Sequence, residues 1–212
     1  MSIASVNPVR PARVVLVSGP SGSGKSTLAE GSGLPVLQLD DFYKDGDDPT
    51  IPTLPDGSGL DWDTPASWHA EQALDAIRRL CAEGRAEVPI YSIPANGKTG
   101  TQVLDLDGAS VFVAEGIFAA EIVRACEAEG LLAAALCVRN RPVVTAWRRF
   151  RRDVREGRKS VPFLLRRGYR LMRAERAIVT YQVSRGAEPV TTAEARTRLA
   201  ACSAETPIPA AV

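Results

Sequence analysis

Nine residues near the start of the chain have the types and spacing needed to hold linked phosphates. The run Gly19-Pro20-Ser21-Gly22-Ser23-Gly24-Lys25-Ser26-Thr27 satisfies the pattern GxxxxGK[ST] in full and follows the apolar segment 14–17. In such a loop, backbone N–H groups surround an anion, the lysine reaches the outer phosphates and the next hydroxyl ligates Mg²⁺. A flexible Gly/Ser linker would not join a β-branched run to a helix start. We predict that a nucleoside triphosphate, ATP or another, is held with Mg²⁺ by Gly19, Ser21, Gly22, Ser23, Gly24, Lys25, Ser26 and Thr27.

Acidic residues follow two further apolar runs. Asp40 and Asp41 come after segment 34–39, and Glu115 comes after segment 111–114. Ligands of open parallel sheets bind beyond the carboxyl ends of the strands, so these acids should share a crevice with the phosphate loop (residues 19–27). Phosphoryl transfer there needs a proton acceptor and a metal. Asp40 is a candidate to accept the proton of an acceptor hydroxyl, and it could also contact Mg²⁺ through water.

Two of these assignments have alternatives. Asp41 is the rival of Asp40, because side chains alternate along a strand and only one of the pair would point into the crevice. Glu115 is predicted to orient Mg²⁺ or its waters, as acids after such strands do in phosphate-loop enzymes. Its alternative role is to complement the dipole of a following helix.

A basic cluster lies far from the phosphate loop in the sequence. Its members are Arg148, Arg149, Arg151, Arg152, Arg155, Arg158 and Lys159. Arginines three and four apart on one helix face repel one another, which a merely solvated face does not require. We predict a lid in which Arg149, Arg152 and Arg158 stabilise the transferring charge, with Gly157 as its hinge. A solvated surface helix is the alternative.

The elements that must position these residues follow from hydrophobic periodicity. The pattern predicts strands at 13–18, 34–39, 111–114 and 133–138, and a hairpin whose strands at 88–91 and 102–106 flank a turn at 96–100. Helices are predicted at 25–31, from 63–65 to Gly84, at 119–128, 141–156 and 161–184. Residues 44–60 lack periodicity and predict a surface loop. The fold class is α/β: a three-layer P-loop NTPase fold with a mostly parallel sheet, a small hairpin insertion and an Arg-rich lid.

The same pass along the chain predicts its organisation. An N-terminal segment (1–12) precedes one P-loop domain at 13–186. This domain contains the hairpin at 86–107 and the lid at 149–160. A tail at 187–212 comes last, with a weak helical signal at 192–201. No internal repeat is visible.

Composition narrows the partners. The 212 residues carry a net charge of only +1, which argues against general nucleic-acid binding. No apolar run approaches the roughly 18 residues of a membrane span, and residues 1–13 lack the apolar core of a secretory signal. The four cysteines show no metal-binding or disulfide spacing, so a reducing cytoplasm fits best. We expect a small-molecule substrate, and leave self-association open.

Several ordered motifs resemble the uridine kinase family, a branch of the P-loop kinases related to phosphoribulokinase. Residues 39–44 look like the family's Q-D-S-F-Y-[RK], residues 61–65 like N-F-D-H-P, and residues 88–91 like I-P-V-Y. Residues 115–117 repeat E-G-I, and residues 149–158 resemble the R-x-x-R-D…R-G-R lid. The resemblance covers roughly residues 14–176, and several motifs in order are far more specific than the phosphate loop alone.

The resemblance implies roles for individual residues. Asp40 would be the base for the 5′-hydroxyl of a nucleoside, Tyr43 would border the nucleoside, and Asp63 would hold the ribose hydroxyls. Trp62 would line the pocket and Tyr91 would contact the base. Asn96 stands where the family has a histidine that contacts the pyrimidine. Arg166 replaces a usual glutamine, and the family's late strand is not recognisable near residues 186–190.

These observations predict a cytoplasmic kinase that transfers the γ-phosphoryl of a nucleoside triphosphate to the 5′-hydroxyl of uridine or cytidine. Two alternatives stay open. One is a kinase of the same class whose acceptor is pantothenate, a sugar or a phosphosugar. The other is a nucleotide-binding switch that hydrolyses slowly and signals through its conformation, because motifs define the donor half of a site better than the acceptor half.

Overall fold

A five-stranded parallel sheet forms the centre of the molecule, as seen in a computed structural model that describes residues 11–139 and 176–204. The strand order is β2-β5-β1-β6-β7. The bounds are Arg13–Ser18 for β1, Val36–Gln38 for β2, Val111–Glu115 for β5, Leu132–Val138 for β6 and Glu188–Val190 for β7. β1 therefore lies between β5 and β6, and its carboxyl end faces neighbours on both sides. The loop after β1 is thus placed at the middle of the sheet edge.

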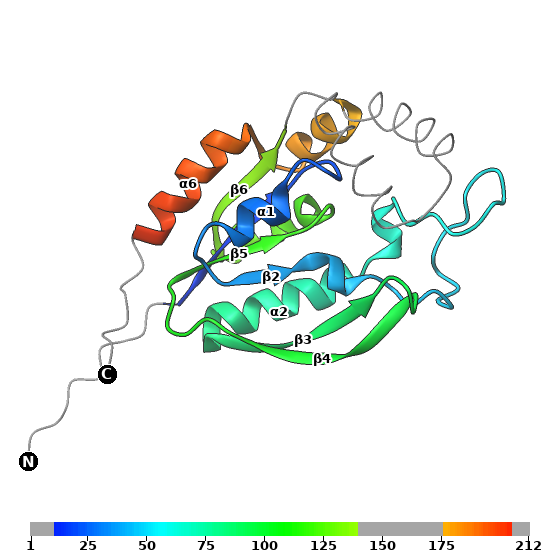
Figure 1. The fold of residues 1–212 in the computed structure, drawn as a ribbon, viewed down its shortest axis with the longest axis horizontal. Helices are drawn as coiled ribbons and strands as arrows, with labels where there is room; N and C mark the ends of the chain where they lie inside the picture. The colour runs from blue at the N-terminus through cyan, green and yellow to red at the C-terminus, as the bar shows by residue number, and fades with distance from the viewer. Residues whose placement is uncertain (1–10, 140–175, 205–212) are drawn as a thin grey trace, which may run out of the picture.

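Helices cover both faces of this sheet, which explains why β1 is a continuous apolar run (Figure 1). Val14 and Leu16 join a core with α2 (Ala70–Glu83) and with the short helices η3 (Ala119–Ile122) and α3 (Val123–Ala128). Val15 and Val17 join a second core with α1 (Lys25–Glu30) and α6 (Thr192–Ala204). A strand buried on both faces has no polar side, as its sequence requires.

Helix α2 begins later than the sequence predicts. Residues Pro65–Ser67 form a separate 3₁₀ turn, η2, whose cap Thr64 accepts a hydrogen bond from the Ala66 N–H at 3.4 Å. Trp68 then adopts an extended conformation, because it bridges to Tyr43 and donates its indole N–H to the Leu39 carbonyl at 2.7 Å. The helix ends at Gly84, whose φ of 75° lies in the left-handed region. The single predicted helix is therefore wrong at its start and right at its end.

The two strands of the hairpin are longer than predicted, and they form a sheet of their own. It consists of β3 (Arg85–Ser92) and β4 (Gly97–Asp105), paired antiparallel. The predicted turn at 96–100 is wrong, because β4 already begins at Gly97 and the turn lies at 93–96. The twin strands run along one side of α2 in Figure 1, away from the parallel sheet.

The segment predicted as a tail contributes to the domain. β7 pairs in parallel with β6, and Val190, Ala195 and Leu199 are buried in the core beside β1. The boundary predicted at residue 186 is therefore not a domain boundary, because β7 and α6 belong to the same core. β7 has only three residues, and two of them, Glu188 and Pro189, are exposed. Such a strand is too short and too polar to be recognised from hydrophobic periodicity.

The predicted lid at 149–160 lies outside the described residues. The same is true of its arginines Arg149, Arg152 and Arg158 and of its hinge Gly157. Residues 176–184 are helical and lead back to β7. Within the two described ranges, no helix is long and apolar enough to cross a membrane.

Candidate functional site

The phosphate loop joins the buried strand β1 to helix α1. Gly24 precedes the helix with a φ of 90°, a left-handed conformation that a residue with a side chain rarely adopts. Lys25 is buried, and its ammonium donates to the Gly19 carbonyl at 3.0 Å and to the Pro20 carbonyl at 3.3 Å. Ser26 and Thr27 are exposed at the start of the helix. The loop thus curls around the lysine and leaves the hydroxyls accessible.

Glu115 ends the strand next to this loop. Parallel pairing of β5 with β1 sets Glu115 opposite Val17, two residues before the loop begins. The side chain is buried, and its Oε2 finds no hydrogen-bond partner among the described residues. Burial raises the pKa of Glu115, whereas Lys25 and the Ser26 hydroxyl lower it. A buried carboxylate oxygen beside a lysine and a hydroxyl fits the surroundings of a divalent cation.

Asp40 comes directly after a strand, as the sequence predicts, and lies against the end of β5. Residues Leu39–Phe42 form a 3₁₀ turn, η1, directly after β2. The Asp40 carboxylate accepts the Ile117 N–H at 3.2 Å, and a Cβ at Gly116 would come within 2.9 Å of the same oxygen. Gly116 therefore allows the carboxylate to approach the end of β5.

The surroundings of Asp40 disfavour its charge. Crowding by protein atoms removes water from the carboxyl and raises its pKa, although part of the residue stays open to solvent. Lys25 and the Ile117 N–H act in the opposite direction and lower that pKa. A carboxyl that is easier to protonate than usual is suited to receive a proton near neutral pH.

Asp41 points elsewhere. Its Oδ1 accepts the backbone N–H of Tyr91 at 3.2 Å, so this side chain ties η1 to the hairpin. The two neighbouring carboxylates thus diverge, as the sequence predicts, although a 3₁₀ turn and not strand alternation separates them. Burial raises the pKa of Asp41, and the charge of Asp40 raises it further.

Lys25 connects the loop to both crevice carboxylates. Its charge lowers the pKa of Asp40 and that of Glu115, so all three groups lie within electrostatic reach of one another. Within the described residues no cluster of three or more His, Cys, Asp or Glu side chains could hold a metal by itself. Mg²⁺ does not require one, because it is usually held by one or two carboxylates together with phosphates and water.

An aromatic cluster lies beside Asp40. The Tyr43 ring is 5.9 Å from Trp62, 5.9 Å from Tyr91 and 5.8 Å from Phe118, measured between centroids. The Tyr43 hydroxyl donates to the Trp62 carbonyl at 3.3 Å. Burial raises the pKa of Tyr43, and the charges of Asp40 and Asp63 raise it further. Three residues predicted to contact substrate are therefore brought together, although 48 positions separate Tyr43 from Tyr91.

The remaining predicted substrate residues lie at the rim of this cluster. Asp63 is exposed, and its N–H donates to the Asp61 carboxylate at 3.1 Å. Asn96 is in the hairpin turn with a φ of 54°, and its carbonyl accepts the Gly46 N–H at 2.8 Å. A Cβ at Gly46 would collide with the Asn96 side-chain amide, so this amide packs against the loop after η1.

Two buried residues of the site were not found from the sequence. Phe118 packs between Tyr43 and Trp68. Gln182, on helix 176–184, donates from Nε2 to the Ile117 carbonyl at 3.0 Å and accepts the Cys137 thiol at 3.2 Å. Neither carries a motif, and only the tertiary structure places them next to the turn that holds Asp40.

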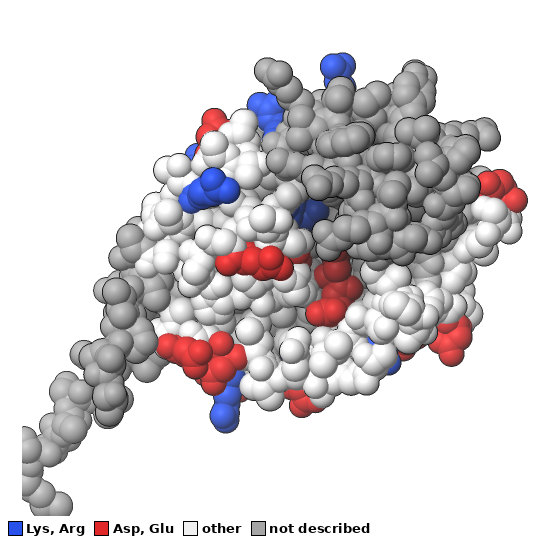
Figure 2. Space-filling view, viewed as in Figure 1, with Lys and Arg blue, Asp and Glu red and all other residues white. Residues whose placement is uncertain are grey.

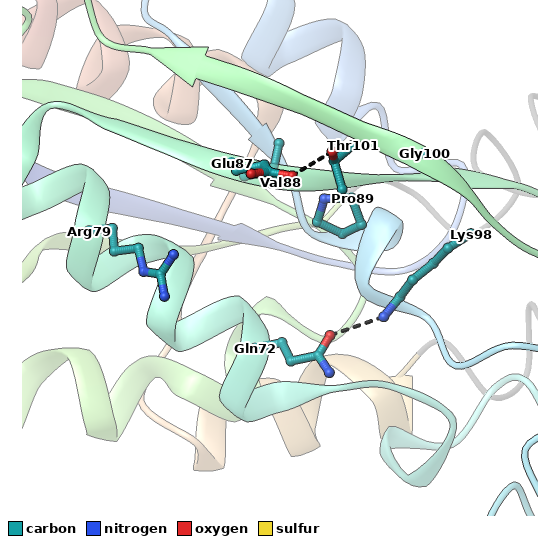
Figure 3. Close-up of a pocket in the computed structure, with 8 residues that line it drawn as sticks. All are labelled: Gln72, Arg79, Glu87, Val88, Pro89, Lys98, Gly100 and Thr101. Atoms are coloured by element: carbon teal, nitrogen blue, oxygen red, sulfur yellow. Dashed lines mark hydrogen bonds between the residues drawn. The ribbon is translucent and has the colours of Figure 1, made fainter.

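A groove of about 440 Å³ lies between α2 and the hairpin (Figure 3). Gln72 and Arg79 project into it from the helix, while the strands supply the other residues that line it, which are Glu87, Val88, Pro89, Lys98, Gly100 and Thr101. None of them is a predicted site residue.

Acidic side chains gather near the middle of the face seen in Figure 2, over the region where Figure 1 places α1, β2 and the following turn. This negative charge favours a cation such as Mg²⁺.

The fold and the loop together define a class of protein, the P-loop NTPase fold, as predicted. A solved structure described as a "putative fructose transport system kinase", from Silicibacter sp. TM1040, is similar with a TM-score of 0.57. It is 17% identical, and the likeness covers 83% of this chain and 87% of that one. A structure described as a "possible uridine kinase", from Bacillus stearothermophilus, reaches a TM-score of 0.44 at 17% identity over 66% of this chain and 77% of that one, too low to bear on the fold.

In sequence, the chain is 30% identical over 119 residues to the uridine kinase of Schizosaccharomyces pombe (strain 972 / ATCC 24843). The match covers 53% of this chain, and the chain spans only 26% of the length of that relative. No protein-family model matches. The sequence likeness supports the uridine kinase-like P-loop kinase family that the ordered motifs predict.

Proposed function

We propose that the protein is a kinase that transfers the γ-phosphoryl of ATP, or another nucleoside triphosphate, to a hydroxyl of a small molecule. One observation carries the proposal: the lysine of the phosphate loop acts electrostatically on both Asp40 and Glu115. A phosphate cradle and two carboxylates close to its lysine would together serve phosphoryl transfer. The likeness to kinases in sequence and in fold supports the same reaction class.

Each group has a defined task in this reaction. Lys25 neutralises the outer phosphates, and Asp40 accepts the proton of the attacking hydroxyl. The Ile117 N–H, donated to Asp40 at 3.2 Å, keeps the carboxylate oriented. Arg149, Arg152 and Arg158 are proposed to stabilise the transferring charge from the lid.

The residues present fit Mg²⁺. The Ser26 hydroxyl would ligate it, and Glu115 and Asp40 would orient its water ligands. The buried Oε2 of Glu115, which has no hydrogen-bond partner among the described residues, supports this assignment. When bound, the ion supplies charge neutralisation on the phosphates and a template for their alignment.

The acceptor site favours a flat or ring-shaped molecule with hydroxyl groups. Tyr43, Trp62 and Tyr91 provide aromatic surface, and Asp63 at the rim provides a carboxylate that accepts hydrogen bonds. Uridine or cytidine, phosphorylated at the 5′-hydroxyl, satisfies both features and is our first candidate. A sugar is the second candidate, because the solved neighbour of similar fold is described as a fructose transport system kinase.

The test is a screen of the purified protein with Mg-ATP against nucleosides, pantothenate, sugars and phosphosugars, with products identified by mass. A nucleoside 5′-monophosphate is the expected product. Phosphorylation of a sugar and of no nucleoside would show that the second candidate is the acceptor. Slow release of phosphate without any phosphorylated acceptor would contradict the kinase and favour a nucleotide-dependent switch.

A further inference from the structure

The tip of the hairpin is hydrogen-bonded to the loop that carries Asp40. The hairpin tip comprises residues 91–98, and the acceptor loop comprises residues 40–46. Asp41 accepts the Tyr91 N–H at 3.2 Å, and Asp45 accepts the Lys98 N–H at 2.7 Å. The Tyr91 hydroxyl also donates to the Lys44 carbonyl at 3.3 Å. Two carboxylates of one loop therefore hold one backbone N–H on each strand of the hairpin.

Close approach of the two segments depends on glycines at matching places. A Cβ at Gly46 would collide with the Asn96 side chain, and a Cβ at Gly97 would come within 2.9 Å of the Asp45 carboxylate. The Gly46 N–H also donates to the Asn96 carbonyl at 2.8 Å. Both sides of this contact are thus shaped to fit each other.

In the part of the chain that the structure describes, the hairpin does not pair with the main sheet. β3 and β4 form a separate two-stranded sheet, and an isolated hairpin is marginally stable in water. Its base is anchored, because Ala86 and Val88 are buried and the Leu106 N–H donates to the Gly84 carbonyl. Between base and tip lies the groove of Figure 3, across which the Lys98 side chain reaches Gln72 at 3.0 Å.

We propose that Asp41 and Asp45 are positioning residues that clamp the hairpin tip to the acceptor loop and so set the affinity for the acceptor. The clamp acts through Tyr91, whose ring lies 5.9 Å from Tyr43 and forms one wall of the aromatic cluster. Neither aspartate touches the phosphate loop in any described contact, so the nucleotide side is independent of them. The inference rests on the proposed function, which supplies the acceptor.

The experiment compares Asp41→Ala and Asp45→Ala with wild type in steady-state kinetics. Each variant should raise the KM for the acceptor about tenfold, the factor expected when one charge-assisted hydrogen bond is lost. The KM for the nucleotide should stay at the wild-type value. Asn retains an oxygen that can accept a backbone N–H, so Asp41→Asn and Asp45→Asn should restore most of the acceptor affinity.

The matched control is Asp47→Ala, which removes an exposed carboxylate just beyond the acceptor loop and should change neither KM. Hydrogen exchange measured by mass spectrometry gives a second readout that does not need activity. Peptides of the hairpin tip should exchange faster in both alanine variants, while peptides of β1 should keep their protection.

The proposal is overturned if acceptor KM is unchanged in both alanine variants, or if nucleotide KM rises as much as acceptor KM. Unchanged exchange at the tip, or loss of protection throughout the protein, also overturns it. If wild type phosphorylates no acceptor, the proposed function fails, and the exchange experiment still decides whether the two aspartates clamp the tip.

Discussion

The two halves of the candidate site are built in different ways. The phosphate half is one continuous segment, residues 13–30, in which a strand buried from Val14 onward, a glycine-rich loop and a short helix succeed one another. The acceptor half is assembled from η1, residues 61–63, the hairpin tip and residues 116–118. Local sequence is therefore sufficient for the phosphate half, whereas the acceptor half exists only in the folded chain.

The two halves also differ in burial. Val14, Val15, Leu16 and Val17 beneath the phosphate loop are at most 1% exposed, whereas Asp63 and Asn96 at the acceptor rim are exposed. Rigid packing beneath the loop suits a reaction step shared by all kinases of this class. A partly exposed wall made of several segments can vary without disturbing that step. Substitutions should therefore reduce turnover at Lys25 and at the proposed base Asp40, and reduce acceptor affinity in the aromatic wall of the acceptor half.

The largest effect is expected from Lys25→Ala. Removing one preorganised group that stabilises developing charge should lower kcat about 10²- to 10³-fold. Turnover with the acceptor identified in the screen provides the measurement, and Arg79→Ala, an exposed cation on α2, provides the control. Near-normal turnover of Lys25→Ala would contradict the mechanism.

Asp40→Asn should also reduce kcat, by about 10²-fold, the lower end of the range for a general base, because the amide cannot accept the proton. In wild type, kcat/KM should fall as pH falls through the pKa of Asp40, which lies above the usual range of an aspartate. The acid limb of the profile should therefore begin at a higher pH than an ordinary carboxyl gives. A variant that kept both turnover and this limb would show that Asp40 is not the base.

The same variant should be more stable than wild type. A carboxyl whose pKa is higher in the folded than in the unfolded protein binds more protons when folded, so stability falls as pH rises through the window between the two values. Above that window the cost is fully present, and Asn removes it. Thermal unfolding without ligands should give a higher Tm for Asp40→Asn, with Asp47→Asn as the unchanged control.

Gln182→Met tests whether the hydrogen bond behind Ile117 supports Asp40. The Gln182 amide donates a hydrogen bond to the Ile117 carbonyl, and the Ile117 N–H donates one to the Asp40 carboxylate. Losing this support should lower kcat about tenfold and leave both KM values near wild type, by the usual worth of a buried hydrogen bond. Gln102→Met, exposed on β4, is the control. Unchanged kcat would confine Gln182 to a packing role.

The smallest effect is expected from Trp62→Ala. An edge-to-face aromatic contact such as that of Trp62 with Tyr43 contributes about 0.5–1.5 kcal/mol, so acceptor KM should rise roughly two- to tenfold. The KM for the nucleotide, measured in the same assay, serves as the internal control. A larger effect on the nucleotide than on the acceptor would contradict the division between the two halves.

Much of the fold could be predicted because its strongest signals are local. β1 has the bounds that its apolar run predicts, and the ends of α1 at Gly31 and of α2 at Gly84 follow from glycines at the C-caps. The predicted start of α2 is wrong because Trp68 is pulled into an extended conformation by its indole bond to Leu39. The predicted hairpin turn is wrong because strand pairing outweighs its turn-like residues. β7 escapes prediction because it is a strand only beside β6.

The sequence alone determined the phosphate loop and the residue types of the crevice, because a strand, a turn and a helix start depend on neighbours along the chain. Only the tertiary structure decided which aspartate faces Lys25, which one holds Tyr91, and that Gln182 supports Ile117. Asp40 and Ile117 are 77 residues apart in the sequence, and Ile117 and Gln182 are 65 residues apart. Contacts across such distances arise from the packing of a whole sheet, which no local pattern encodes.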